Sequence, residues 1–351
     1  MEELIYLDNA ATTKPKVFRN DYNIFWMNSN NPYTKNEEQK ELEKAKNKIK
    51  NCLNLNTGYV LFFRCATEAI EWLAHNFCVS EVYCSPYEHD SVFNVSDRIM
   101  ENETQIFFNH EEYGLYCHQL VNQITGDTWD IKKAKEEFVT KPNQFFGVDL
   151  TAAIGHVILP NNLEEYCDAL WFSGHKFYTE KNMGCMWISN RLAECLCATK
   201  DPRNQYGLLH GTIDTQGVMM IANALEYVQN TICYTYNPYH EFVSRLITDL
   251  WIRKIDANLI TVSKNKTYAI NAIHFPGINA DALQTYLASK DIYIGVAHSA
   301  CTDNADYRVL ENMGISKEVA KDTVRISFSI DNTLHDIICL IEEIKNFKER
   351  F

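Results

Sequence analysis

The stretch Asp168-Ala169-Leu170-Trp171-Phe172-Ser173-Gly174-His175-Lys176 joins an apolar run to a short polar motif that ends in a lysine. The apolar run predicts a buried strand. A lysine just after a buried strand can be desolvated, which favours its neutral amine and therefore Schiff-base formation with an aldehyde. Lys176 is thus the first candidate for a catalytic residue.

Short apolar runs alternate with helical patterns on both sides of this stretch. The runs lie at 59–63, 81–84, 144–148 and 169–172, and the helical patterns include 67–76 and 131–139. This alternation predicts an α/β fold with a mostly parallel sheet covered by helices. In such sheets ligands bind at the carboxyl ends of the strands, where several chemically reactive segments of this chain fall.

The pattern changes after two helical segments at 213–232 and 240–255. Strand-like segments then follow at 268–275, 292–296 and 323–329, with a helix at 281–289 and a final amphipathic helix that carries Ile337, Ile338, Ile341 and Ile344. We therefore expect a large domain of residues 14–235 and a smaller α+β domain of residues 1–13 and 236–351.

Composition and charge argue against several classes of protein. The 351 residues include 33 basic and 46 acidic side chains, and the net charge of -13 is spread along the chain, which disfavours direct binding of nucleic acid. The first residues lack a secretory pattern, and no apolar run reaches membrane-spanning length. We expect a cytoplasmic protein with no membrane segment.

The cysteines predict free thiols rather than a disulfide framework or a metal site. There are 12, scattered through the chain and mostly within apolar segments, such as those around Cys78 and Cys84. No Cys-x-x-Cys pair occurs, and Cys195 and Cys197 are too closely spaced for the usual zinc pair. No structural metal is expected.

Three residues near predicted strand ends suit an aromatic phosphate cofactor. Asp149 follows the apolar run at 144–148, where a carboxylate can pair with a protonated pyridine nitrogen. Thr67 lies at the start of a predicted helix, whose free backbone amides and hydroxyl suit a phosphate. His89 follows another strand and could stack on an aromatic ring or move protons.

These motifs, with others in the same order along the chain, resemble the cysteine desulfurases of the class V aminotransferase family, the group that feeds iron–sulfur cluster assembly. The resemblance implies a pyridoxal 5'-phosphate (PLP)-dependent transferase of fold type I. The matching segments are Tyr6-Leu7-Asp8-Asn9-Ala10-Ala11-Thr12-Thr13, Asn31-Pro32, Ala66-Thr67-Glu68, Glu88-His89, Asp149, Ser173-Gly174-His175-Lys176, Gly211-Thr212, Ser299-Ala300-Cys301 and Val324-Arg325-Ile326-Ser327.

The resemblance assigns roles around PLP. Lys176 would form the Schiff base, Asp149 would pair with the pyridine nitrogen, and His89 would stack on the ring. The remaining residues expected to contact the cofactor, chiefly at its phosphate, are Ala66, Thr67, Gln123, Ser173 and His175.

The resemblance also implies a homodimer, because Thr212 would reach the phosphate of the neighbouring subunit. Arg325 would grip the substrate carboxylate, a bidentate task that suits arginine better than lysine. Asn31 would assist it. Cys301, in a predicted loop, would take sulfur from L-cysteine as a persulfide, leaving L-alanine, and pass it to an acceptor protein that the sequence does not identify.

Four positions depart from the family's pattern. Gln123 replaces an asparagine, Ala152 a glutamine, Leu209 an arginine and Cys65 a glycine. Ala152 matters most, because the family's glutamine donates a hydrogen bond to the phenolate oxygen of PLP, a bond that Gln123 would have to supply here. The chain is also shortened between Phe108 and Leu120.

Two other functions fit the same fold. A selenocysteine lyase or a transaminase would use the same cofactor site, although Cys301 in its motif favours desulfuration, and an assay for sulfide and alanine discriminates. A non-catalytic scaffold subunit of a sulfur-transfer complex would have no physical need to keep Lys176, Cys301 and Arg325 together.

Overall fold

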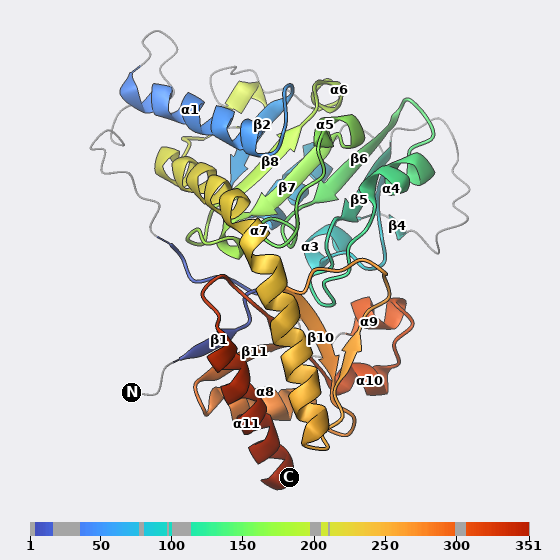
Figure 1. Cartoon of the computed structure of the whole chain (residues 1–351). Helices are drawn as coiled ribbons and strands as arrows, with labels where there is room; N and C mark the ends of the chain where they lie inside the picture. The colour runs from blue at the N-terminus through green and yellow to red at the C-terminus, as the bar shows by residue number, and fades with distance from the viewer. Residues whose placement is uncertain are drawn as a thin grey trace. The chain divides into compact units, whose positions relative to one another are not determined.

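The computed structural model describes residues 4–16, 36–76, 81–96, 98–99, 114–196, 205–209, 211–298 and 307–350. Its contacts divide the chain into two compact units, coloured along the chain in Figure 1. The larger unit comprises residues 14–120 and 130–231. The smaller unit comprises residues 1–13, 121–129 and 232–351.

The larger unit is built on one sheet, whose described strands lie in the order β2-β8-β7-β6-β5-β3-β4. Neighbours from β7 to β4 are parallel, while β8 is antiparallel to both β7 and β2, so that β2 runs in the same direction as β7. The strands are β2 (Tyr59–Phe63), β3 (Glu81–Cys84), β4 (Arg98–Ile99), β5 (Gly114–Gln119), β6 (Gln144–Asp149), β7 (Ala169–Ser173) and β8 (Gly184–Ile188).

Helices cover this sheet, which is why its central strands are buried along their whole length. Helix α2 packs Ala69, Ile70 and Leu73 against the strands in one apolar core. The helical elements of the larger unit are α1 (Glu37–Cys52), α2 (Ala66–Asn76), α3 (Asp90–Phe93), α4 (Ile131–Phe138), α5 (Leu163–Tyr166), η1 (Gly174–Lys176), α6 (Asn190–Ala193) and η2 (Gln205–Gly207).

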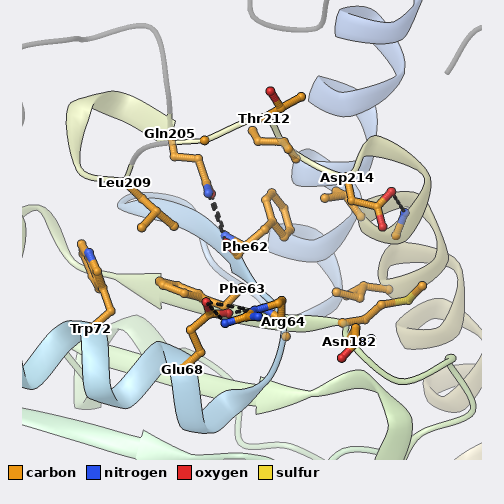
Figure 2. A pocket seen from close by; sticks show the side chains of 17 residues that line it. Phe62, Phe63, Arg64, Glu68, Trp72, Asn182, Gln205, Leu209, Thr212 and Asp214 are labelled. Carbon is orange, nitrogen blue, oxygen red and sulfur yellow. Dashed lines mark hydrogen bonds and ion pairs between the residues drawn. The ribbon is translucent and has the colours of Figure 1, made fainter. Parts of the chain in front are cut away.

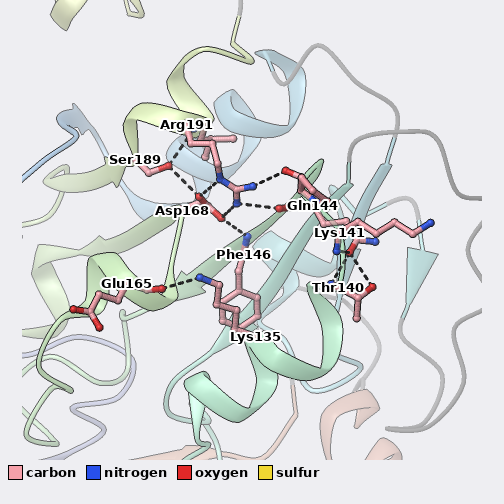
Figure 3. A network of polar contacts seen from close by, with 11 residues as sticks. Lys135, Thr140, Lys141, Gln144, Phe146, Glu165, Asp168, Ser189 and Arg191 are labelled. Atoms are coloured by element: carbon pink, nitrogen blue, oxygen red, sulfur yellow. Dashed lines mark hydrogen bonds and ion pairs between the residues drawn. The ribbon is translucent and has the colours of Figure 1, made fainter.

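A polar network around the buried Asp168 carboxylate ties β6 and β7 to α6 (Figure 3). The Asp168 carboxylate, just before β7, accepts hydrogen bonds from the Phe146 backbone N–H at 3.0 Å and from the Ser189 hydroxyl at 3.1 Å. The Arg191 guanidinium pairs with Asp168 and also donates to the carbonyl oxygen of Gln144 at 2.9 Å. Because every partner lies within the scaffold, we interpret this network as structural.

The smaller unit has a sheet in the order β1-β11-β12-β10-β9. Strand β1 is parallel to β11, and the other neighbours are antiparallel. Its elements are β1 (Ile5–Leu7), β9 (Asn258–Ile260), β10 (Ile270–His274), α8 (Ala280–Ala288), β11 (Ile292–Val296), α9 (Arg308–Asn312), α10 (Lys317–Lys321), β12 (Thr323–Ser327) and α11 (Leu334–Arg350).

The structure joins two predicted helices into one. The helical patterns at 213–232 and 240–255 form one helix, α7 (Thr215–Ile252), with Pro238 inside it. Proline removes one backbone hydrogen bond and often bends a helix, but flanking turns can continue past it. None of the described helices is long and apolar enough to cross a membrane.

Candidate active site

The carboxyl ends of β2, β7, β6 and β3 share one edge of the larger unit's sheet, because these strands run in the same direction. Each strand leads into a residue that the sequence nominates. Ala66 and Thr67 follow β2, Lys176 follows β7, Asp149 ends β6, and His89 follows β3. The fold therefore brings these candidates to one edge of the sheet, as expected for an α/β ligand site.

The start of α2 and the end of β7 meet in a candidate anion cradle. The Ala66 backbone N–H donates to the Ser173 hydroxyl oxygen at 2.8 Å, and Ser173 is buried. The first backbone N–H groups of a helix carry partial positive charge, and Thr67 adds a hydroxyl beside them. These are the groups that a phosphate needs.

The departure at Cys65 has a local role. Its Sγ accepts a hydrogen bond from the Glu68 backbone N–H at 3.5 Å, so the thiol caps the first turn of α2. A Cβ atom at Gly184, the first residue of β8, would lie 2.6 Å from the Cys65 backbone. Gly184 thus lets the turn before α2 lie directly against the sheet.

The loop of Lys176 is tightly built. It is the short helix η1, in which Gly174 donates its N–H to the Met183 carbonyl oxygen at 2.7 Å. A Cβ at Gly174 would lie 2.3 Å from the Thr179 Oγ1. The η1 turn therefore requires glycine at this position, and it fixes where the backbone of Lys176 begins.

His175 is neutral at physiological pH. Burial, together with the charges of Lys176 and Lys181, lowers its pKa from 6.5 to about 4. A neutral imidazole beside an anion site acts through a hydrogen bond rather than through charge.

Asp149 is buried at the end of β6, and its Oδ1 accepts a hydrogen bond from the Thr151 backbone N–H at 2.7 Å. The Thr151 hydroxyl oxygen is buried without a hydrogen-bond partner in the described part of the chain. Buried hydroxyls normally have a partner, so an unpaired one beside Asp149 suits a ligand that supplies it.

His156 is a nearby residue that the sequence reasoning missed. It is buried, its Nδ1 lies 3.1 Å from the Ala152 carbonyl oxygen, and burial together with the charge of Lys176 lowers its pKa. Its only sequence signal is its place seven residues after Asp149, in the turn that also contains Ala152.

His89 is the N-cap residue of α3 and is exposed. Its Nδ1 accepts a hydrogen bond from the Ser91 backbone N–H at 3.1 Å. Because Nδ1 is the acceptor, the neutral ring carries its proton on Nε2. The ring is therefore oriented by the start of the helix.

Arg325 and Gln123 both lie in the smaller unit. The Arg325 Nη2 donates to the Asp8 carboxylate at 2.8 Å, and its Nη1 donates to the Gln123 carbonyl oxygen at 3.2 Å. Among the described residues, the Arg325 Nε and the Gln123 Oε1 are buried atoms without a hydrogen-bond partner. Asp8 stands in the opening motif of the sequence, but the sequence alone assigned it no role.

Thr212 is exposed and lines a pocket of about 310 Å³ in the larger unit (Figure 2). The pocket combines apolar side chains, including Phe62, Trp72 and Leu209, with the Arg64–Glu68 ion pair. Leu209, which stands where the family has an arginine, packs against the core of the sheet. Leu209 thus makes an apolar contact at a position where the family's pattern has a charged arginine.

Two predicted site residues, Asn31 and Cys301, lie outside the described residues, as do the Asn31-Pro32 turn and much of the segment between Phe108 and Leu120. Within the part that the structure describes, no group of three or more His, Cys, Asp or Glu side chains is placed to hold a metal ion. The cysteines described there carry free thiols.

Comparison with known proteins identifies the family. Residues 5–116 and 110–340 match the family described as aminotransferase class-V, so the chain belongs to the class-V aminotransferases. The resemblance read from the sequence motifs is thereby confirmed.

Similar curated proteins include cysteine desulfurases from several bacteria. The cysteine desulfurase IscS of Clostridium botulinum (strain Kyoto / Type A2) is 24% identical over 385 residues, which cover 100% of this chain and 96% of that protein. The cysteine desulfurase IscS of Buchnera aphidicola subsp. Schizaphis graminum (strain Sg) is 25% identical over 377 residues, covering 96% and 91%.

Solved structures with the same fold include a NifS-like protein, with a TM-score of 0.84 and 20% identity, covering 99% of this chain and 100% of that one. The NifS-like protein from Rickettsia africae ESF-5 has a TM-score of 0.81 and 19% identity over 99% of this chain and 100% of its own. The expected α/β fold is confirmed.

Proposed function

We propose that this chain is a PLP-dependent cysteine desulfurase, which converts L-cysteine to L-alanine and holds the sulfur as a persulfide on Cys301. One observation carries the proposal furthest: the Ala66 N–H donates to the Ser173 hydroxyl oxygen, which leaves the Ser173 O–H to donate to an anion on the same sheet edge as Lys176 and Asp149. The names of the similar proteins agree with the function predicted from the sequence.

The residues at the sheet edge fit PLP. Thr67, Ser173 and His175 would hold the phosphate, and the Ala66 N–H would orient the Ser173 hydroxyl toward it. Asp149 would face the pyridine nitrogen. The Thr151 hydroxyl, buried without a partner among the described residues, is a polar atom that a ligand could satisfy. When bound through Lys176, PLP supplies an electron sink for the charge left when a bond at the substrate Cα breaks.

The chain's own residues would handle the substrate as follows. Arg325 would bind the carboxylate of L-cysteine, with Asn31 beside it. Lys176, once released from the cofactor, would take the proton from Cα, and His89 can exchange a proton at Nε2. Cys301 would attack as a thiolate, so that a new S–S bond forms while the Cβ–S bond of the substrate breaks. The electron pair of that bond stays with the carbon skeleton, which takes up a proton and leaves as L-alanine.

The homodimer and the cytoplasmic location expected from the sequence stay predictions. The exposed position of Thr212 supports a role toward a neighbouring subunit, since its side chain is accessible in the single chain. Gln123 would replace the hydrogen bond that Ala152 cannot make. The acceptor of the persulfide sulfur would be another protein.

The test is a single-turnover experiment with ³⁵S-labelled L-cysteine, following protein-bound sulfur and alanine together. Cys301→Ala should bind the cofactor normally but lose both labelled persulfide and alanine release, because water is a poor substitute for a thiolate. Cys339→Ala, which removes a partly exposed thiol on α11, is the matched control and should behave as the parent.

Alanine release at the parent rate from Cys301→Ala would contradict the proposal. A selenocysteine lyase would release selenide from L-selenocysteine without needing L-cysteine as a substrate. A transaminase would instead yield a keto acid and leave the cofactor in its amino form.

A further inference from the structure

The opening motif of the chain lies beside the strand that carries Arg325. Strands β1, β11 and β12 are neighbours in the smaller unit's sheet, and Asp8, one residue beyond β1, forms a bridge with Ser327. The Asp8 carboxylate accepts a hydrogen bond from the Arg325 Nη2 at 2.8 Å. Both side chains are mostly buried, with 21% and 15% of their surfaces exposed.

Strand β11 lies between β1 and β12, and its Gly295 leaves room for the contact between Asp8 and Arg325. Gly295 on β11 pairs in register with Arg325 on β12. A Cβ at position 295 would lie 2.6 Å from the Asp8 Oδ1 and 3.0 Å from the Arg325 Nε. The guanidinium can therefore cross β11 to reach Asp8 only because residue 295 has no side chain.

Asp8 is itself held in place by its neighbours in the chain. The Asn9 side-chain amide donates to the Ser327 carbonyl oxygen at 3.0 Å, and the Ala10 N–H donates to the Ser327 hydroxyl at 2.8 Å. The Asn332 amide donates to the Tyr6 carbonyl oxygen at 3.0 Å. Asp8 is thus a fixed anion rather than a mobile surface carboxylate.

The bonds to Asp8 and to the Gln123 carbonyl oxygen leave other donors of Arg325 available, including the buried Nε without a partner among the described residues. A guanidinium held at two points presents its remaining N–H groups in one direction, and this geometry suits a carboxylate.

We propose that Asp8 is the positioning residue of Arg325: it fixes the guanidinium across Gly295 so that its free donors face the carboxylate of an α-amino acid substrate. The inference rests on the proposed function in one respect, namely that Arg325 binds the substrate. Asp8 itself would not touch the substrate or the cofactor.

The test measures kcat and KM for L-cysteine in the PLP-loaded enzyme. Asp8→Ala should raise KM by about tenfold or more with a smaller change in kcat, since it removes a charge-assisted bond to a carboxylate-binding group. Asp8→Asn keeps an acceptor oxygen and should raise KM less. Gly295→Ala keeps every charge but displaces the pair, and it should raise KM as well.

Two comparisons separate positioning from a general structural role. In an Arg325→Ala background, adding Asp8→Ala should cause no further rise in KM, because Asp8 acts through Arg325. Asp249→Ala is the matched control: it breaks the Asp249–Arg245 ion pair of the same unit, 2.6 Å long, and should leave KM unchanged. An unchanged or lower KM in Asp8→Ala would overturn the inference. So would an equal rise in KM when Asp8→Ala is added to the parent and to Arg325→Ala.

A second readout does not depend on turnover. L-alanine should raise the melting temperature of the PLP-loaded parent protein, and Asp8→Ala should lose most of this shift while Asp249→Ala keeps it. If the parent releases no alanine from L-cysteine, the proposed function fails. The L-alanine shift still decides whether Asp8 positions Arg325, and equal shifts in the parent and Asp8→Ala would refute that role.

Discussion

The Ser173 hydroxyl oxygen accepts a hydrogen bond of 2.8 Å from the backbone N–H of Ala66, a residue 107 positions earlier in the chain. The bond joins the end of β7 to the first turn of α2. It brings the hydroxyl of one motif to the helix start of another, and Lys176 follows Ser173 by three residues. An anion bound by both elements would therefore lie close to the loop that carries the lysine.

Ser173→Ala should weaken cofactor binding. The variant removes a buried hydroxyl and leaves the Ala66 N–H without its acceptor, so the dissociation constant of PLP should rise by roughly tenfold. Equilibrium titration followed by absorbance measures the change. Ser289→Ala, at the C-cap of α8, removes a hydroxyl far from the motif in sequence and should leave the constant unchanged. Equal constants in the parent and Ser173→Ala would contradict the cradle.

Lys176→Ala should fold but lose its covalent link to PLP. Borohydride reduction of the PLP-loaded parent protein should add the cofactor's mass to the peptide that contains Lys176, and the variant should gain none there. Lys181→Ala, which removes an exposed lysine of the same loop, should be labelled as the parent is. Labelling of another lysine in the parent would show that Lys176 has been assigned wrongly.

The pKa of His175 predicts how the stability of the cofactor-free protein depends on pH. The folded pKa of about 4 lies below the ordinary value of 6.5, so the unfolded chain binds more protons between these values. The contribution of His175 to the free energy of unfolding is therefore fully present above pH 6.5 and is lost as the pH falls toward 4. His175→Asn should show a smaller loss of unfolding free energy between pH 7 and pH 5 in urea titrations. Parallel curves for the two proteins would disprove this assignment.

Arg191→Ala should destabilise the larger unit by about 1–2 kcal/mol, because the buried Asp168 carboxylate loses a half-exposed cation but keeps its bonds from the Phe146 N–H and the Ser189 hydroxyl. The Arg191 guanidinium also lies 4.2 Å from the centre of the Phe145 ring, a contact that is lost as well. Arg245→Ala breaks an ion pair within one helix and should cost less than about 0.5 kcal/mol. Urea denaturation of both variants measures the difference, and equal costs would mean that the network contributes little.

Four strands of the larger unit, β2, β3, β6 and β7, were predicted because each is largely a short apolar run. The predicted 59–63 and 81–84 coincide with β2 and β3, and 144–148 falls one residue short of β6. Strand β1, with only three residues, was too short for a periodicity to show. The two helical patterns predicted at 213–232 and 240–255 are one helix, α7, which continues through Pro238, although proline more often ends or bends a helix.

Helix α11 shows the limit of a hydrophobic pattern. Ile337, Ile341 and Ile344 are buried as expected, but Ile338 is 40% exposed. Adjacent residues on a helix differ by about 100° in direction, so Ile337 and Ile338 cannot both face the core. Composition alone does not show which of the two is outside.

The candidate site was predictable where a residue follows a strand, and not where it depends on a contact distant in the sequence. Asp149 and Lys176 were found from strand ends and motifs. The pairing of Asp8 with Arg325 could not be predicted from the sequence. It joins residues 317 positions apart through a strand register that only the folded sheet defines. Residues 121–129 belong to the smaller unit, yet nothing in their composition marks them off from the larger unit on either side.

The pairing of β1 with β11 has a consequence for the order in which the chain can fold during synthesis. The larger unit is complete once residue 231 has been made, and it can fold while translation continues. Ile5 pairs with Ile292, so the first strand must wait for almost the whole chain before it gains its partner. A ribosome that stalled before β11 would thus release a chain whose opening strand has an unpaired edge, a species prone to aggregate and a natural substrate for chaperones.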